Sequence, residues 1–527
     1  MSLSDYLAGC DARYEPEIGL VGATAHTPGY HTRLPDGAWV HDTRGNFDYA
    51  QACLQAGDAQ HRERAARVLE VLLGHQESDP CARTYGIWPW FSDEPLDQMA
   101  PPDWNWADFC GARLAAILRW HQDRLPPELA GRCRQALGHA AWSIFRRNVQ
   151  PDYTNIAIMG AGVTLAAGEL LAEPRLVDYG RRRLRRLVEH TRWHGDFNEY
   201  NSPTYTLVAI EEADRILELV RDRPARADAE GLRRRGWRVV AEHWHPGCGE
   251  WAGPHSRCYG DHLPDETRAW LRDGGLPAFS LTRRRPCPAD LRPRFESLGR
   301  DELMLRRRFV RRAAPAAGTV GSTWLNAEAC LGTVNHDTLW VQRRPLLAYW
   351  RLDGVPAAVL RLRMLKDGRD FASGAVWTAQ RGPRALSLIG CVPGQGDFHP
   401  GLDRPADGVF EGRRLVVRYE LAAAEAQVVG TVLRAGAWQA VVQPLAGVFE
   451  GCEVRWTAGC GEDRAWVEAV FYDGPRRGFD REQLASLSLA AGLTVGEAGM
   501  AAESPVAWRD ATRRAARWPA AGLTVGR

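Results

Sequence analysis

The sequence predicts an α+β protein with two domains, a helical N-terminal half followed by a strand-rich C-terminal half. Three observations favour this class. The chain has 527 residues, more than one ordinary domain needs. Apolar residues recur at mostly helical spacing from about residue 42 to about residue 281. After a proline- and arginine-rich stretch at 283–294, the apolar period changes to two. We therefore expect domains at 1–285 and 295–527.

Five segments of the first half carry apolar residues at i, i+3 or i+4 over the length of a helix. They are 107–120, 129–145, 156–167, 176–190 and 208–220. We expect Asp152 or Thr154 to cap the third helix and Pro203-Thr204 to begin the last. Successive helices with short loops form a bundle, a solenoid or a ring of helical hairpins, and the lack of a fixed-period repeat argues against a solenoid.

The second half contains short β-rich stretches separated by Gly, Asp and Pro, which predict an antiparallel sandwich. They are 338–350, 355–364, 415–421, 427–433, 438–442, 452–458 and 465–471. The heptapeptide Ala-Ala-Gly-Leu-Thr-Val-Gly occurs at 490–496 and again at 520–526. We expect two similar edge strands or turns at these positions.

Composition and charge exclude several classes of protein. Apolar residues at 45% and charged residues at 25% are typical of a globular protein, not of a disordered, collagen-like or coiled-coil chain. The formal net charge of +2 argues against a nucleic-acid partner. We see no apolar stretch long enough to span a membrane and no secretory signal, and the twelve cysteines lack tight paired spacing. We therefore expect a cytoplasmic location and no membrane partner. The sequence leaves the oligomeric state open.

Aromatic residues are the unusual part of the composition, because the chain has 21 tryptophans. An indole offers a flat apolar face and one donor, which suits a sugar ring, although many indoles serve as core. Trp104 and Asn105 lie at a loop-to-helix junction downstream of Trp88 and Trp90. This cluster is either a helix cap with packed tryptophans or a sugar subsite.

Two further polar clusters precede predicted helices. Asn155 lies at the start of an apolar helix, where its amide either caps the helix or binds an anionic group with help from the helix dipole. The run at 195–205 brings Asn198, Glu199, Tyr200 and Tyr205 together directly before a helix. A solvated loop would rarely contain two tyrosines there, and we interpret this run as a substrate site.

A third region, after Trp251, places His255, Arg257 and Tyr259 at alternating positions. In an extended segment this spacing puts the three side chains on one face. The alternative is a structural histidine beside a surface arginine. We expect no metal, although His243, His245 and His255 lie close enough in sequence to leave one open. The lack of a Rossmann glycine fingerprint, a Walker loop or an HExxH motif predicts no cofactor.

These motifs resemble the heparinase II/III-like polysaccharide lyases. Asn155 at the start of an apolar helix is followed, about fifty residues later, by Gly-Asp-Phe-x-Glu-x-x-Ser-Pro-x-Tyr at 195–205. The resemblance implies an N-terminal α/α toroid, an incomplete barrel of helical hairpins, followed by an antiparallel β-sandwich. It also implies that Asn155 and Tyr205 match the family's functional asparagine and tyrosine.

The chain also departs from that family. The family's asparagine is usually doubled, whereas Thr154 precedes Asn155 here. A histidine-rich motif of the sandwich is reduced to Asn335-His336-Asp337. We therefore interpret the chain as a divergent relative, for which heparin itself is not the expected substrate.

The chemistry of β-elimination fits these residues. Cleavage beside a uronic acid needs a group that neutralises the carboxylate, a base for the C5 proton and an acid for the leaving O4. Asn155, helped by Arg257, suits the first role. Tyr205 suits proton transfer if cationic neighbours lower its pKa from about 10, and His255 titrates in a suitable range to assist. We expect an acidic oligo- or polysaccharide substrate bound by the remaining polar and aromatic candidates: Trp104, Asn105, Asn198, Glu199, Tyr200, Trp251, Arg257, Tyr259 and His336.

Two other functions stay open at this point. A glycoside hydrolase would need two carboxyl groups about 5–5.5 Å or 6.5–9.5 Å apart, and the candidates for them are Glu199, Asp103, Asp108 and Glu250. A non-catalytic protein would bind oligosaccharide through Trp88, Trp90 and Trp104 and release no product.

Overall fold

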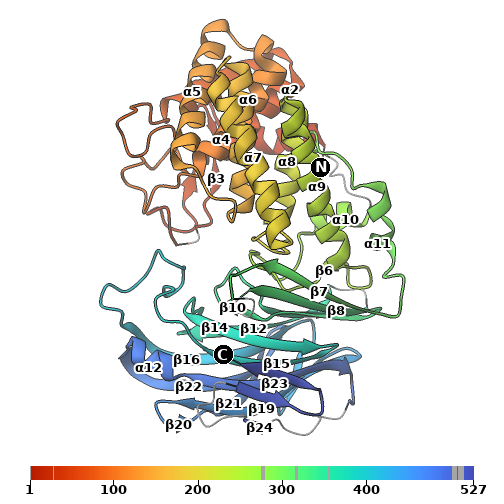
Figure 1. Ribbon diagram of the computed structural model, residues 1–527. Helices are drawn as coiled ribbons and strands as arrows, with labels where there is room; N and C mark the ends of the chain where they lie inside the picture. The colour runs from red at the N-terminus through yellow and green to blue at the C-terminus, as the bar shows by residue number, and fades with distance from the viewer. Residues whose placement is uncertain are drawn as a thin grey trace. The chain divides into compact units, whose positions relative to one another are not determined.

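The computed structural model describes residues 2–27, 29–273, 279–314, 318–353, 356–500, 507–508 and 515–526. These residues form a mixed α+β structure (Figure 1). The helices are α1 (Leu3–Asp11), α2 (Thr43–Ala56), α3 (Ala59–Gly74), α4 (Trp106–His121), α5 (Pro127–Arg147), α6 (Thr154–Leu170), α7 (Pro174–His194), α8 (Tyr205–Leu219), α9 (Arg223–His243), α10 (Asp265–Arg272), α11 (Pro293–Glu296) and α12 (Arg481–Ser486), with 3₁₀ turns at Gln122–Arg124 and Ala289–Leu291. None of the helices in these ranges combines the length and apolar character that a membrane span requires.

The strands begin in short pairs and become long after residue 301. They are β1 (Tyr14–Glu15), β2 (Leu20–Val21), β3 (Ala23–Thr24), β4 (Trp39–Val40), β5 (Trp244–His245), β6 (Glu250–Trp251), β7 (Glu302–Val310), β8 (Thr319–Asn326), β9 (Ala329–Val334), β10 (His336–Thr338), β11 (Leu346–Trp350), β12 (Ala358–Lys366), β13 (Arg369–Asp370), β14 (Gly374–Arg381), β15 (Arg384–Cys391), β16 (Phe410–Ala422), β17 (Gln427–Val429), β18 (Val432–Ala435), β19 (Trp438–Phe449), β20 (Cys452–Glu453), β21 (Arg455–Gly461), β22 (Arg464–Phe479), β23 (Ser488–Glu497), β24 (Ala507–Trp508), β25 (Ala515–Trp518) and β26 (Leu523–Gly526).

The chain divides into two compact units that interleave along the sequence. The first unit contains Met1–Arg192, Leu207–Gly236 and Gly275–Pro286. The second unit contains Trp193–Thr206, Trp237–Gly274 and Cys287–Arg527. The segments 193–206 and 237–274, which the sequence assigns to a helical domain, are thus grouped with the sheets.

The five helices predicted from apolar spacing are confirmed as α4 to α8, each with ends that differ by a few residues. Within the first unit, α6 is buried on almost its whole circumference. A Cβ atom on Gly168 would lie 2.7 Å from Cγ2 of Val177, and one on Gly180 would lie 2.7 Å from Cγ of Leu165. Glycine at these two positions therefore lets α6 and α7 pack closely.

The predicted caps of α6 are wrong. The helix begins at Thr154, its N-cap residue is Tyr153, and the Tyr153 side chain makes no capping hydrogen bond. Neither Asp152 nor Thr154 is the N-cap residue. Asp152 precedes Tyr153, and Thr154 is already the first residue of the helix. The side chain of Asn155 lies inside the first turn and is 1% exposed.

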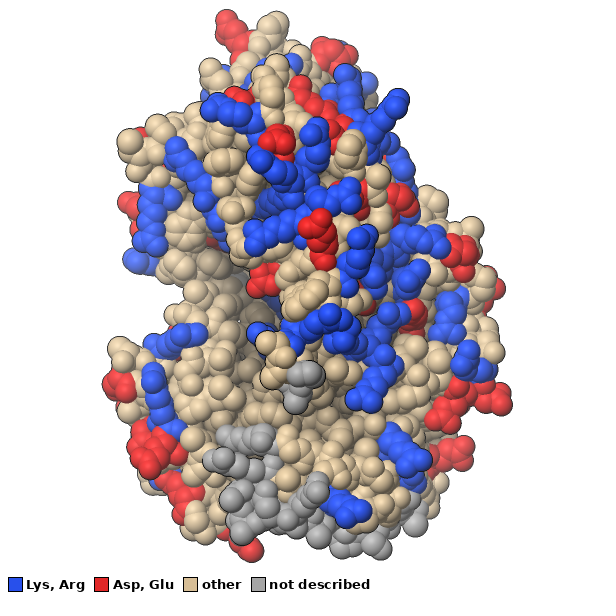
Figure 2. Space-filling view, in the orientation of Figure 1, with Lys and Arg blue, Asp and Glu red and all other residues tan. Residues whose placement is uncertain are grey.

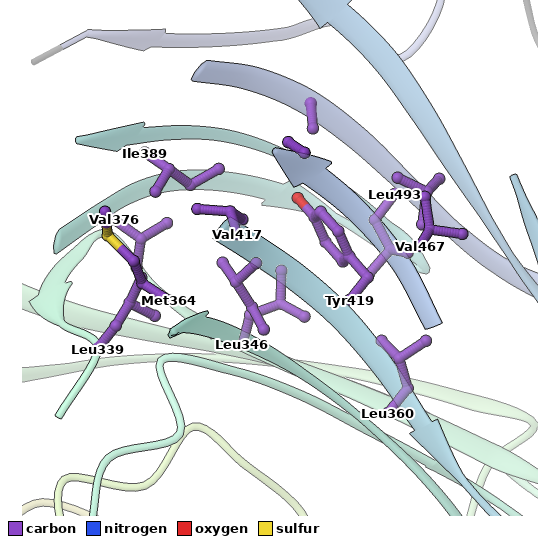
Figure 3. Packing of buried hydrophobic residues seen from close by; sticks show 14 of the residues in the cluster. Leu339, Leu346, Leu360, Met364, Val376, Ile389, Val417, Tyr419, Val467 and Leu493 are labelled. Atoms are coloured by element: carbon purple, nitrogen blue, oxygen red, sulfur yellow. The ribbon is translucent and has the colours of Figure 1, made fainter. Parts of the chain in front are cut away.

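The second unit is built on two large antiparallel sheets. One has the order β21-β22-β16-β12-β11-β9-β8-β7, with β13 paired to β12, and the other has the order β10-β14-β15-β23-β19-β18-β17, with β20 paired to β19. Apolar side chains from both sheets form a large buried cluster (Figure 3). In β16, Leu415, Val417 and Tyr419 join this cluster, whereas Arg418 and Glu420 form ion pairs on the other face. This alternation is the period of two expected of a strand.

The strand prediction was incomplete. All seven predicted stretches contain strands, but β7, β8, β9, β14 and β15 were missed. In β9 every residue is buried, so the alternation used to detect strands is absent there. The predicted stretch 338–350 is two strands, β10 and β11, separated by a loop that carries Gln342 and Arg344.

The repeated heptapeptide occupies two different environments. The copy at 490–496 lies in β23, which pairs with β15 and β19 inside a sheet, so the predicted edge position is wrong there. The second copy overlaps β26, which is an edge strand of the small sheet β24-β25-β26. Trp518 of β25 and Leu523 of β26 belong to an apolar cluster with Leu388 of β15. Identical sequences therefore differ in their pairing.

Candidate functional site

The site lies in the second unit, where three chain segments are joined by buried hydrogen bonds. Asn201 has a left-handed backbone (φ 42°), a conformation that asparagine tolerates better than most residues. Its Nδ2 donates to the carbonyls of Ala252 (2.8 Å) and Pro254 (2.9 Å), and its Oδ1 accepts from Nε1 of Trp251. Asn201 thus fixes the segment 193–206 to the segment after β6.

Ser202 extends this connection and sets the start of α8. Its Oγ accepts from the backbone N–H of Tyr205 (2.9 Å) and donates to the carbonyl of Arg257. Tyr205, the first residue of α8, is therefore held beside Arg257 by a side chain that bonds both backbones.

The third segment is the loop between β10 and β11. The backbone N–H of His255 donates to the carbonyl of Arg344 (3.0 Å), and the N–H of Arg344 donates back to His255 (2.9 Å). The N–H of Cys258 donates to the carbonyl of Gln342 (2.7 Å). This short antiparallel pairing brings Gln342 next to Arg257.

The phenol oxygen of Tyr205 is the centre of the resulting cluster. Nη2 of Arg257 donates to it across 2.9 Å, and the hydroxyl of Tyr259 lies 2.5 Å away. The guanidinium carbon of Arg257 also lies 4.2 Å from the centroid of the Tyr205 ring. A cation in this position stabilises negative charge on the phenol oxygen.

Arg257 is itself held by two further side chains. Its Nε and Nη2 donate to Oε1 of Gln342 (3.0 and 2.9 Å), and its Nη1 lies 3.4 Å from Oε1 of Glu199. Because Gln342 is neutral, it orients the guanidinium without competing for its charge. We call Glu199, Tyr205, Arg257, Tyr259 and Gln342 the tyrosine cluster.

The tyrosine cluster reaches the protein surface at one end. Tyr259 is 64% exposed, Tyr205 is half-buried, and the side chain of Glu199 is 9% exposed. The two phenol hydroxyls are therefore close to solvent, whereas the groups that orient Arg257 lie deeper. This is the arrangement of a site in which a bound molecule meets the phenols first.

His255 is placed differently from Arg257 and Tyr259, although the three alternate in sequence. It is 2% exposed, its Nδ1 lies 2.6 Å from the carbonyl of Asn201, and burial lowers its pKa to about 3. The ring is thus neutral at physiological pH and donates from Nδ1. This hydrogen bond gives His255 a part in holding the Asn201 segment in place.

The other candidates of this unit differ in their burial. Trp251 is 1% exposed, so it offers no face to a sugar ring. Tyr200 stacks on Phe309 with ring centroids 4.5 Å apart and donates its hydroxyl to Asp337, and burial raises its pKa. Asn198 is half-buried, and His336 is exposed, with its ring centroid 4.9 Å from that of Trp377.

The remaining candidates belong to the first unit. Asn105 Nδ2 donates to the Tyr153 hydroxyl (3.2 Å), and its Oδ1 accepts from Arg147 (2.7 Å). Asn155, the second residue of α6, is buried. Trp104 is half-buried and donates from Nε1 to the carbonyl of Arg83 (3.2 Å). The sequence clusters around residues 105 and 155 thus meet through Tyr153.

Asp108 lies near Asn105 in sequence and is 1% exposed. Burial raises its pKa to about 7, and its Oδ2 lies 3.9 Å from Nη1 of Arg147. A Cβ atom on Gly160 would lie 2.5 Å from Oδ1 of Asp108 and 2.8 Å from Nη1 of Arg183. Glycine 160 thus makes room for a buried carboxyl beside a buried guanidinium.

Hydrogen bonds within the fold involve three candidates for a metal site or for hydrolysis: His243, His245 and Glu250. His243 Nδ1 bonds the carbonyl of Val239 (2.9 Å), and His245 Nε2 bonds the carbonyl of Asn326 (2.8 Å). Glu250 accepts from Arg268 (2.7 Å) and His262 (3.0 Å). Across the described part of the chain, no group of three or more His, Cys, Asp and Glu side chains is arranged to hold a metal ion. Trp88, a candidate platform, is fully buried.

Sequence reasoning missed Gln342, Asn201 and Ser202. Gln342 lies 85 residues from the guanidinium that it orients, so nothing in its own neighbourhood marks it. Asn201 and Ser202 lie inside the run at 195–205, but their bonds go to backbone carbonyls that have no sequence signature. An asparagine before Ser-Pro was the available signal, because asparagine is enriched at left-handed positions.

The charged surface is rich in arginine. On the face shown in Figure 2, Arg side chains gather over the helical part, with carboxylates between them. On α7, Arg182 pairs with Asp178 and Arg185 pairs with Asp228, and Arg186 is exposed. Carboxylates thus neutralise part of the arginine charge on this surface.

Comparison with known proteins gives one family model and several solved structures. A model described as a domain of unknown function (DUF8769) matches residues 10–267. A search of curated proteins finds no match. Chondroitin AC lyase from Streptomyces coelicolor, solved with chondroitin sulphate, is 11% identical with a TM-score of 0.49, over 99% of this chain and 83% of that chain.

Two further solved structures are similar at lower TM-scores. A protein described as heparinase III is 10% identical with a TM-score of 0.36, over 86% of this chain and 78% of that chain. A mutant heparan sulfate lyase from Pedobacter heparinus is 10% identical with a TM-score of 0.35, over 96% of this chain and 89% of that chain. At such identities and scores these likenesses carry no information about the reaction, which must be inferred from the side chains of this chain.

Proposed function

We propose that this chain is a lyase that cleaves uronic-acid-containing oligo- or polysaccharides by β-elimination, with Tyr205 as the acid/base. One observation carries the proposal: the Tyr205 oxygen lies 2.9 Å from a guanidinium nitrogen of Arg257, beside the exposed Tyr259. A tyrosine removes a proton only as its phenolate, and the neighbouring guanidinium of Arg257 stabilises that form.

The reaction also requires neutralisation of the substrate carboxylate. The C5 proton becomes removable when hydrogen-bond donors take up the charge that develops on the adjacent carboxylate. We assign this role to Asn155, at the start of α6 in the first unit. In the second unit, Glu199 and Gln342 orient Arg257, and His255 holds the Asn201 segment that carries Tyr205.

The finer architecture belongs to the same proposal. We assign the helices to an incomplete α/α toroid and the large sheets to a β-sandwich, with the division at 1–285 and 295–527. An acidic glycan is the expected substrate because the mechanism depends on a carboxylate next to the proton that is removed.

An absorbance screen against uronate-containing oligo- and polysaccharides tests the proposal. Elimination leaves a C4–C5 double bond conjugated to the carboxylate, so the ultraviolet absorbance rises as substrate is consumed. We expect this rise for the wild type, and a loss of at least about 10³-fold in kcat for Tyr205→Phe. A circular dichroism spectrum and a melting temperature close to wild type would show that the variant is folded.

Two results would contradict the proposal. A fully active Tyr205→Phe variant would remove the acid/base role. New reducing ends without an absorbance rise, lost in Glu199→Gln, would indicate hydrolysis, whereas under elimination Glu199→Gln keeps Tyr205 and Arg257 and the product keeps its double bond.

A further inference from the structure

The hydroxyl of Tyr259 has a position that the role of Tyr205 does not explain. It lies 2.5 Å from the Tyr205 oxygen, while the two ring centroids are 6.1 Å apart with planes at 51°. The two phenols therefore approach one point from different directions. Tyr259 is 64% exposed, so a substrate that reaches Tyr205 also meets the Tyr259 hydroxyl.

The two phenols differ in their contacts with Arg257. The guanidinium donates to Tyr205 at 2.9 Å and lies over its ring at 4.2 Å. For Tyr259, the described contact is the hydroxyl of Tyr205 itself. The cation therefore favours negative charge on the oxygen of Tyr205 over negative charge on that of Tyr259.

We propose that the two proton transfers are divided between these residues, with Tyr205 as the base and Tyr259 as the general acid that protonates the leaving group. This inference rests on the proposed elimination and adds a second catalytic residue to it. The C5 proton and the O4 oxygen are on neighbouring carbon atoms, so their partners must be close together. Two phenol oxygens in hydrogen-bond contact meet that requirement on one face of the sugar.

The proton balance closes without another reactant. The phenolate of Tyr205 takes the C5 proton, the C–H electron pair becomes the C4–C5 double bond, and the C4–O4 bond breaks. Tyr259 gives its proton to O4, which leaves as a hydroxyl, and becomes a phenolate. The proton on Tyr205 then crosses the 2.5 Å hydrogen bond to Tyr259, and both residues return to their starting forms.

The inference predicts a dependence on the leaving group. A sugar oxygen leaves only when it is protonated, whereas a 4-nitrophenol oxygen leaves as the anion. The experiment compares two substrates built on the uronate found active in the absorbance screen, one with a sugar at O4 and one with a 4-nitrophenyl group at O4. Wild type, Tyr259→Phe and Tyr205→Phe are assayed on both.

We expect Tyr259→Phe to lower kcat by at least about 100-fold on the sugar substrate and by less than about 10-fold on the 4-nitrophenyl substrate. Tyr205→Phe is expected to lose activity on both substrates, because the C5 proton must be removed in either case. Tyr472→Phe is the matched control, since it removes a phenol that bonds the carbonyl of Pro475 in β22, and it should behave as wild type on both.

Each other outcome has one meaning. If the wild type is active and Tyr259→Phe loses nothing, or loses equally on both substrates, Tyr259 is not the acid and the inference is overturned while the proposed function stands. If the wild type produces no double bond from any uronate in the absorbance screen, the proposed function is overturned and the inference with it.

Discussion

Two polar regions of the molecule differ in the solvent exposure and hydrogen bonding of their ionisable groups. Around Tyr205 in the second unit, the cluster opens to solvent through Tyr259, and each polar group has a hydrogen-bonding neighbour. Around Asp108 in the first unit, the carboxyl is enclosed at 1% exposure, and its Oδ1 has no hydrogen-bond partner among the residues that the structure describes. The first arrangement suits proton exchange with a ligand. In the second, burial raises the free energy of the ionised carboxyl.

The contrast extends to the response to acid. Burial raises the pKa of Asp108 to about 7, whereas burial lowers the pKa of His255 to about 3. A buried carboxyl with a raised pKa stabilises the folded state at low pH. A buried imidazole with a lowered pKa destabilises the folded state at low pH. Desolvation is the cause in both places, and the sign follows from which form is charged. Substitution of either residue tests the sign of its contribution to stability.

Asp108→Asn removes the acid-favoured contribution. The folded pKa is about 7 and the unfolded reference is 3.8, so the folded state binds the proton in between and gains stability as the pH falls through that window. Between pH of about 7 and 4, Asp108 contributes a gain of about 3 kcal/mol to the free energy of unfolding. Urea unfolding at both pH values should show that gain missing in the variant. An unchanged pH slope would contradict the buried, protonated carboxyl.

His255→Gln should change the slope in the other direction. The folded pKa of about 3 lies below the unfolded value of 6.5, so the contribution of His255 is complete above 6.5 and is lost as the pH falls toward 3. Acidification from about pH 7 to 4 costs the wild type about 3 kcal/mol through this residue. The variant should lose less on acidification in the same urea measurement. Equal losses would mean that His255 is solvated and titrates normally.

The substitution Asn155→Ala tests whether the first unit takes part in the reaction. If the Asn155 amide neutralises the substrate carboxylate, its removal should lower kcat by about 100-fold in the absorbance assay, because one lost donor to developing charge has that size of effect. Thr154→Val is the control, since it alters the neighbouring buried residue and should leave kcat unchanged. Equal activity of the two variants would confine the site to the tyrosine cluster.

Local sequence patterns determined the element types well. The helices α4 to α8 were predicted because their apolar residues follow the helical period. The strand β16 was found because the apolar residues at 417, 419 and 421 alternate with Arg418 and Glu420. The strand β9 was missed because it is buried on both faces and has no alternation. The toroid, the sandwich, the domain boundary and the cytoplasmic location stay predictions.

The site was only partly readable from the sequence. The run at 195–205 identified Tyr205 through its composition, and the alternation at 255–259 drew attention to Arg257 and Tyr259. That alternation failed to place His255 with them, because its backbone pairs with Arg344 and its ring lies under the Asn201 segment.

The sequence by itself thus determined the helical and extended segments and the residue types available for chemistry, since both depend on near neighbours along the chain. Only the tertiary structure decided that Arg257, Tyr259 and Gln342 meet Tyr205. Arg257 is 52 residues from Tyr205, and Gln342 is 85 residues from Arg257. Contacts over such separations depend on the path of the folded backbone, here on Asn201, Ser202 and the pairing of residues 255–258 with 342–344, and no local pattern records that path.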